Sequence, residues 1–183
     1  MKFHVIIFIA VCFRRKAAMG SLSRRSPHAQ LEAMRRHWPD FYAKKEANGL
    51  LWWYGPLQPQ ALRYLIEIYW RPGVLDRPWV IIDKPAIMPI AGKEYEDIPH
   101  LIFNEANPER SALCLFDPEG NEWRDSDLIA ETTVWWAAEW LNYYELWHVT
   151  GEWLAPSVGF ESVGHMKAVE EQALREAAEH VHR

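Results

Sequence analysis

Cysteine and glycine are scarce in this 183-residue chain, which has two cysteines, Cys12 and Cys114, and nine glycines. Two cysteines cannot build a disulfide framework or supply the paired cysteines of a zinc finger. Nine glycines and 12 prolines are too few for a linker or a fibrous protein. With 49% hydrophobic residues, the chain is instead expected to fold around a core of its own.

The sequence also lacks a long hydrophobic run. The apolar segment Val5–Phe13 has nine residues, whereas a membrane-spanning helix needs about 20. The basic residues 14–16 follow this segment, which is the wrong side for a secretory signal peptide. We therefore expect no stable membrane insertion and a cytoplasmic location.

Residues 1–25 are predicted to be an N-terminal extension of a domain that covers residues 26–183. Three explanations of the first 18 residues stay open: translation that starts at Met19, a short membrane-associating segment, or a signal peptide. The intact mass of the natively expressed protein distinguishes them.

Positive charge is not in excess, because the net charge is −5 and the isoelectric point lies near 5.9. A nucleic-acid partner is therefore not expected. The sequence has no phosphate-binding motif of the G-x-x-x-x-G-K-[ST] or G-x-G-x-x-G type, and no G-x-S-x-G nucleophile motif. Nucleotide cofactors and serine hydrolysis thus have no support, and we expect no cofactor.

Tryptophan, by contrast, is abundant, with 11 residues, which predicts an aromatic-rich core or interface. Ser26 is a candidate helix N-cap, with Pro27 at the first helical position. Apolar spacing predicts a helix over residues 28–47 that Pro39 kinks or divides. Three strand-like runs follow at short spacing, which predicts an antiparallel meander. These runs cover residues 50–54, 61–70 and 79–82.

The second half begins with a proline-rich loop over residues 85–108, and loops of this length inside a domain are usually functional or disordered. A short apolar run over residues 111–116 follows. Asp125 or Ser126 is predicted to cap a long helix that ends near Thr150, and a terminal helix is predicted over residues 162–182.

The long helix is apolar on most sides, so we expect it to be buried or to lie under a partner. Trp136, Trp140 and Trp147 share one stripe and are predicted to be core residues. Trp135 and Tyr144 fall outside this stripe and are better placed to contact a partner.

Cys114 is the nucleophile candidate, because it follows the proline-rich loop and precedes a turn, where a side chain can be presented at the surface. The competing interpretation is a small buried hydrophobic residue between Leu113 and Leu115. His100 is the nearest histidine, and it is either an acid–base group or a structural loop residue.

The amides of Asn104 and Asn107 could stabilise an oxyanion, although loop asparagines mostly form turns. A metal site is not predicted, because His100 and Cys114 would need two further ligands and no recognisable set lies nearby. A cysteine hydrolase built on the same two residues lacks an orienting Asp or Asn at a recognisable spacing.

The order of helix, meander, proline-rich loop, cysteine and long helix resembles the ubiquitin-conjugating (UBC) fold, an α+β fold. A more specific likeness covers residues 99–154, and a likeness in fold covers residues 26–182. Over residues 99–154 the sequence is similar to the stand-alone (type II short form) ubiquitin-conjugating-enzyme-like proteins of CBASS anti-phage operons. The segments that carry this resemblance are Ser111–Pro118, Glu122-Trp123, Asp127–Ala130, Glu139–Leu141, Glu145–Trp147 and Thr150–Leu154.

The resemblance implies a transferase. Cys114 would form a thioester with the C-terminus of a cGAS-like nucleotidyltransferase encoded beside it and pass that acyl group to lysine amines of acceptor proteins. The alternative is a UBC-fold binding partner of the same nucleotidyltransferase that does no chemistry. The eukaryotic enzymes carry a His-Pro-Asn tripeptide as oxyanion support, whereas this chain has Pro99-His100 and then Asn104, so the oxyanion donor stays unassigned.

Overall fold

The computed structural model describes residues 24–75, 77–116 and 122–155 of the chain. The predictions for the first 18 residues and for the terminal helix over residues 162–182 lie outside these described residues.

The first helix, α1, covers Pro27–His37. Its start agrees with the prediction, because the Ser26 hydroxyl accepts a hydrogen bond from the Ala29 amide at 3.1 Å and Pro27 is the first helical residue. The predicted extension to residue 47 is wrong. Trp38 leaves the helical conformation directly before Pro39, as a residue before proline tends to do, and the chain then forms a strand.

The central sheet has six strands in the order β1-β2-β3-β4-β6-β5, and every neighbouring pair is antiparallel. The strands are β1 (Tyr42–Lys45), β2 (Leu51–Leu57), β3 (Tyr64–Trp70), β4 (Trp79–Lys84), β5 (Leu101–Ile102) and β6 (Ala112–Leu113). The predicted α+β class and antiparallel meander are confirmed. The strand predicted from residue 61 begins at Tyr64, because the Ala61 amide donates to the Glu145 carboxylate of the long helix instead.

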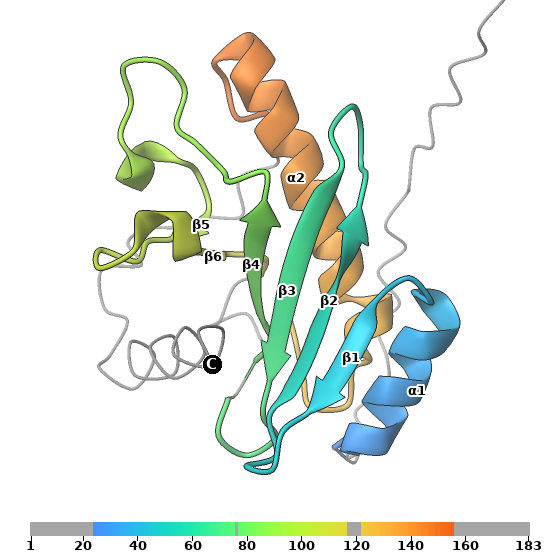
Figure 1. Ribbon diagram of the computed structural model, residues 1–183. Helices are drawn as coiled ribbons and strands as arrows, with labels where there is room; N and C mark the ends of the chain where they lie inside the picture. The colour runs from blue at the N-terminus through green and yellow to red at the C-terminus, as the bar shows by residue number, and fades with distance from the viewer. Residues whose placement is uncertain (1–23, 76, 117–121, 156–183) are drawn as a thin grey trace, which may run out of the picture.

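The long helix α2 covers Thr133–Thr150 and crosses behind β2 and β3 in the view of Figure 1, whereas α1 lies beside β1. Between sheet and helices lies the main core, in which Trp53, Ile66, Ile68 and Trp70 are fully buried against Val134 and Leu141. The sheet thus provides a rigid base for the segments that follow β4.

The start of α2 differs from the prediction. Residues 129–131 form a short 3-10 helix, and α2 begins at Thr133 rather than at Asp125 or Ser126. Its end is as predicted, because Gly151 adopts a left-handed conformation (φ 76°) and its amide closes the last turn on the Trp147 carbonyl.

Two of the five aromatic predictions on α2 are confirmed, because Trp140 and Trp147 are buried core residues. Trp135 is 59% exposed, and its contact with a partner stays a prediction. Trp136 is half-buried and packs against the core rather than inside it. The prediction for Tyr144 is wrong, because its ring stacks on Trp140 and only 6% of the residue is exposed.

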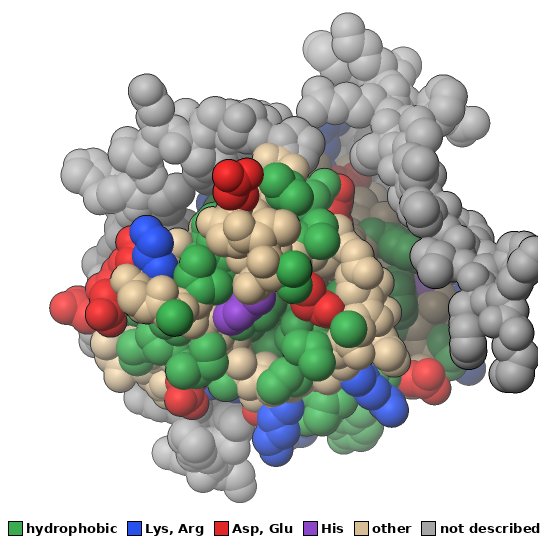
Figure 2. Space-filling view, turned by 90° about the horizontal axis from the view of Figure 1, so that it is seen from above, with side chains coloured by type: hydrophobic (Ala, Val, Ile, Leu, Met, Phe, Trp, Pro, Cys, Tyr) green, Lys and Arg blue, Asp and Glu red, His purple; other side chains and the backbone are tan. Residues whose placement is uncertain are grey.

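The far face of the sheet carries a second, smaller core that surrounds the buried carboxylate of Glu67. Its buried members are Leu50, Tyr69, Leu75, Trp79, Ile81 and Ala112. One end of the molecule is also rich in exposed apolar side chains (Figure 2). The exposed residues Leu62, Met88 and Val149 belong to the β2–β3 connection, the segment after β4 and the end of α2, and these elements lie at this end in Figure 1.

None of the helices among the described residues combines the length and the apolar character that a bilayer crossing requires.

Candidate active site

The predicted nucleophile and the predicted histidine lie side by side on the hairpin formed by β5 and β6. Leu101 pairs with Leu113 in this hairpin, and the next pair of positions is His100 and Cys114. The Cys114 amide donates a hydrogen bond to the His100 carbonyl at 2.9 Å, so the two residues are cross-strand neighbours. The hydrogen bond therefore closes a loop of 13 intervening residues, 101–113.

The long helix fixes the same carbonyl. The indole Nε1 of Trp140 donates to the His100 oxygen at 2.9 Å, so this oxygen accepts one donor from the cysteine strand and one from α2. His100 also has a positive φ of 54°, which is uncommon for a residue with a Cβ atom. Residues are held in such conformations where their surroundings determine them, and often at functional sites.

The His100 ring packs against Trp153, which belongs to an aromatic cluster. Its ring centroid lies 5.7 Å from that of Trp153, and Trp153 in turn packs against Trp140 and Tyr143. Burial lowers the pKa of the His100 imidazole below its ordinary value. At neutral pH the imidazole is therefore uncharged and able to accept a proton.

Cys114 lies at the boundary between core and solvent. Leu113 is buried, whereas Cys114 and the following Leu115 are partly exposed. Cys114 directly follows β6, and the partial exposure of this residue distinguishes it from a cysteine enclosed in the core.

The structure does not bring Asn104 to Cys114. The Asn104 amide N–H donates to the Ser111 hydroxyl at 2.9 Å, which places Asn104 toward the turn of the hairpin. Its side-chain oxygen accepts a hydrogen bond from the Asn107 amide at 3.1 Å. Both asparagines therefore shape the turn before the short 3-10 helix Pro108–Arg110.

A buried ion pair beside the hairpin was missed by the sequence analysis. Arg110 donates from Nη1 to Glu67 Oε1 at 2.7 Å and from Nη2 to Oε2 at 3.0 Å, and the Tyr69 hydroxyl also donates to Oε2. The one signal in the sequence was a glutamate within an otherwise apolar strand.

The Glu67 carboxylate is charged despite its burial. Burial raises the pKa of the Glu67 carboxyl, but the hydrogen bonds from Arg110 and Tyr69 outweigh burial and hold that pKa below its ordinary value. The hairpin is thus anchored to the middle of the sheet by an ion pair in its charged form.

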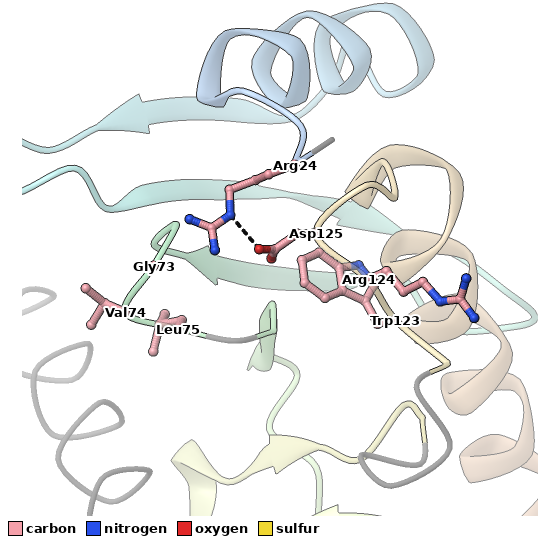
Figure 3. A pocket seen from close by; sticks show the side chains of 7 residues that line it. All are labelled: Arg24, Gly73, Val74, Leu75, Trp123, Arg124 and Asp125. Atoms are coloured by element: carbon pink, nitrogen blue, oxygen red, sulfur yellow. Dashed lines mark hydrogen bonds and ion pairs between the residues drawn. The ribbon is translucent and has the colours of Figure 1, made fainter. Parts of the chain in front are cut away.

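A separate hollow of about 480 Å³ lies near the start of α1 (Figure 3). Val74 and Leu75 form one side of it, and Arg24 pairs with Asp125 across it at 2.5 Å. Arg124 extends away from Arg24, so the two cations do not converge on one point. None of the predicted site residues lines this hollow.

Metal ligands are not gathered in the described part of the chain, where no three His, Cys, Asp or Glu side chains are grouped for an ion.

The fold and the site together define an α+β protein that places a partly exposed cysteine opposite an uncharged histidine on a short hairpin of its sheet. The family model described as Type II CBASS E2 protein matches residues 30–160, and the chain belongs to this family. The resemblance to the ubiquitin-conjugating-enzyme-like proteins of CBASS is thereby confirmed. A comparison with curated proteins finds no match.

Proposed function

We propose that this CBASS protein is a thioester-forming transferase of the UBC fold, with Cys114 as its nucleophile. The thiol would carry the C-terminal acyl group of a cGAS-like nucleotidyltransferase and pass it to lysine amines. The observation that carries this proposal is the position of Cys114, partly exposed and directly opposite His100 on the β5–β6 hairpin.

The first step is an acyl exchange. A free carboxylate does not condense with a thiol in water, so the acyl group must arrive activated, as an acyl adenylate or as a thioester on another protein. Cys114 Sγ attacks the carbonyl carbon, the activating group leaves, and the thiol proton passes to a base. The uncharged imidazole of His100, whose main chain is hydrogen-bonded to that of Cys114, is our candidate for this base.

The second step transfers the acyl group to an amine. A neutral lysine Nζ attacks the thioester carbonyl, the Cys114 thiolate leaves, and the amine loses a proton as the isopeptide bond forms. The partly exposed position of Cys114 supports this step, because both the donor chain and the acceptor lysine must reach the sulfur.

We assign Asn104 and Asn107 to the hairpin turn and leave them out of the chemistry. Their bonds to one another and to Ser111 account for their positions. Oxyanion support would then come from a group other than these amides. The acceptor proteins and the cytoplasmic location stay predictions.

A co-expression experiment tests the proposal. The full chain is produced with the neighbouring nucleotidyltransferase, and adducts are compared on non-reducing gels for the parent, Cys114→Ala and Cys114→Ser. We expect a thiol-sensitive adduct in the parent, none in Cys114→Ala, and a thiol-resistant ester in Cys114→Ser. Cys12→Ser is the matched control and is expected to keep the parental adduct.

The same experiment distinguishes the binding-partner alternative. If Cys114→Ala retains both the complex with the nucleotidyltransferase and full protection against phage, the transferase proposal is wrong and the non-catalytic partner replaces it.

A further inference from the structure

Main-chain pairing holds the cysteine hairpin only weakly on the sheet. Strand β6 meets β4 at a single register pair, Ile81 with Ala112, whereas β2 and β3 are joined by seven pairs. Strands β5 and β6 have two residues each. Register is poorly determined where so few pairs exist, so another interaction must set the place of the hairpin.

The buried ion pair lies where it can do this. Arg110 is the last residue of the 3-10 helix before β6, and Glu67 is in the middle of the central strand β3. The side chain of Arg110 is 15% exposed and that of Glu67 is 3% exposed. A guanidinium that donates to both oxygens of a carboxylate fixes orientation as well as distance.

The chain between Arg110 and Cys114 is short and enclosed. Ser111, Ala112 and Leu113 are all buried, so little freedom remains between the ion pair and the thiol. A one-residue slip of a strand moves each side chain by about 3.3 Å and turns it to the opposite face. Such a slip would remove Cys114 from its position opposite His100.

We propose that Arg110 and Glu67 are positioning residues for the reacting thiol. Their bidentate ion pair sets the register of the β5–β6 hairpin on the sheet and so holds Cys114 opposite His100. This inference rests on the proposed function, in which Cys114 is the nucleophile.

The decisive variant replaces both charges by apolar side chains, Glu67→Leu with Arg110→Met. Apolar replacement of a buried ion pair often keeps or raises stability, but it has no directional bonds. We expect a melting temperature within a few degrees of the parent and a fall of at least tenfold in the maximal rate of adduct formation. The nucleotidyltransferase concentration at half-maximal rate is expected to stay unchanged.

A second pair of variants covers the case in which the double variant fails to fold. Arg110→Lys keeps the positive charge but loses the guanidinium that donates to both oxygens of Glu67. This variant is expected to lower the maximal rate of adduct formation several-fold. The matched control is Arg35→Lys, which alters an exposed pair with Glu32 on α1 and should keep the parental rate. Parental rates in folded Arg110→Lys or in the folded double variant would overturn the inference.

Hydrogen exchange separates this inference from the proposed function. In the same variants, amide exchange over residues 100–114 should accelerate at least tenfold, while exchange over residues 51–70 stays as in the parent. Unchanged exchange over residues 100–114 overturns the positioning role even if no thioester is ever found. If exchange is faster but no adduct forms, the result supports the positioning role of Arg110 and Glu67 and contradicts only the proposed transferase function.

Discussion

The centre of the sheet and the cysteine hairpin are built from the same kind of strand pairing but are stabilised in different ways. Between β2 and β3 seven residue pairs and the fully buried rings of Trp53 and Trp70 fix the structure. The hairpin has two pairs and depends on side chains from elsewhere, Glu67 on β3 and Trp140 on α2. The scaffold is thus held by its main chain and core, and the site by specific side-chain bonds.

The largest expected effect concerns the scaffold. Trp53→Ala removes a fully buried ring from the main core and should lower the free energy of unfolding by about 3–5 kcal/mol, as measured by urea titration. Trp135→Ala is the matched control, because that ring is exposed and contacts Trp38 at its edge. We expect a loss of about 1 kcal/mol or less there. Equal losses in the two variants would contradict the core assignment.

The next effect tests the anchor of the hairpin. Glu67→Leu alone leaves the Arg110 guanidinium buried without its carboxylate and should cost about 3 kcal/mol of unfolding free energy. Adding Arg110→Met to this variant should recover most of the loss. If the double variant is as unstable as the single one, packing around Glu67 rather than an unpaired charge is the cause.

A third, smaller effect tests how closely β2 meets the segment after α1. A Cβ atom on Gly55 would overlap the ring of Phe41, which is itself buried. Gly55→Ala should therefore cost about 1–3 kcal/mol by overpacking, measured by thermal or urea unfolding. In a Phe41→Leu background the same substitution should cost less, and an equal cost there would exclude this contact as the reason.

The smallest effect concerns the backbone and the protonation of His100. Its positive φ makes Ala a poor probe of the imidazole, because Ala adopts the left-handed conformation less readily than His or Asn. His100→Asn, a residue that tolerates this conformation, removes the imidazole with less strain. Normal transfer rates in His100→Asn would remove the imidazole from the mechanism.

The pH dependence of stability follows from the same residue. Burial lowers the pKa of His100 in the folded state, so the unfolded chain binds the proton first as the pH falls below about 6.5. Stability should fall from that pH downward, by up to about 1.4 kcal/mol per pH unit, until the folded-state pKa is reached. Urea titrations at several pH values should show a smaller decline in His100→Asn, and identical declines would contradict the burial of the ring.

Local signals in the sequence predicted part of this structure. The Ser26 cap, the end of the long helix near Thr150 and the strand-like runs over residues 61–70 and 79–82 follow from short-range chemistry, and all were predicted. Strand β1 was missed because Phe41 and Tyr42 continue a helical spacing that Pro39 interrupts. Spacing alone does not show that the chain reverses there and pairs with β2.

The site could be predicted only in its components. Cys114 and His100 were singled out by residue type and by the loop between them, but their pairing depends on two-residue strands that have no periodicity. The bond between Arg110 and Glu67 joins residues 43 positions apart, and only the folded sheet brings them together. Tyr144 was misplaced for the same reason, since its hydroxyl is bonded to the main chain of Met88.

The carbonyl oxygen of His100 accepts two hydrogen bonds, and this limits how another polypeptide can lie along the hairpin. A carbonyl oxygen has two lone pairs, and here both are engaged, one by the Cys114 amide and one by the Trp140 indole. A main-chain N–H of a bound polypeptide therefore cannot donate a hydrogen bond to this oxygen. Any strand-like alignment of its backbone must begin from other main-chain groups, which restricts the directions from which its terminus can approach the sulfur.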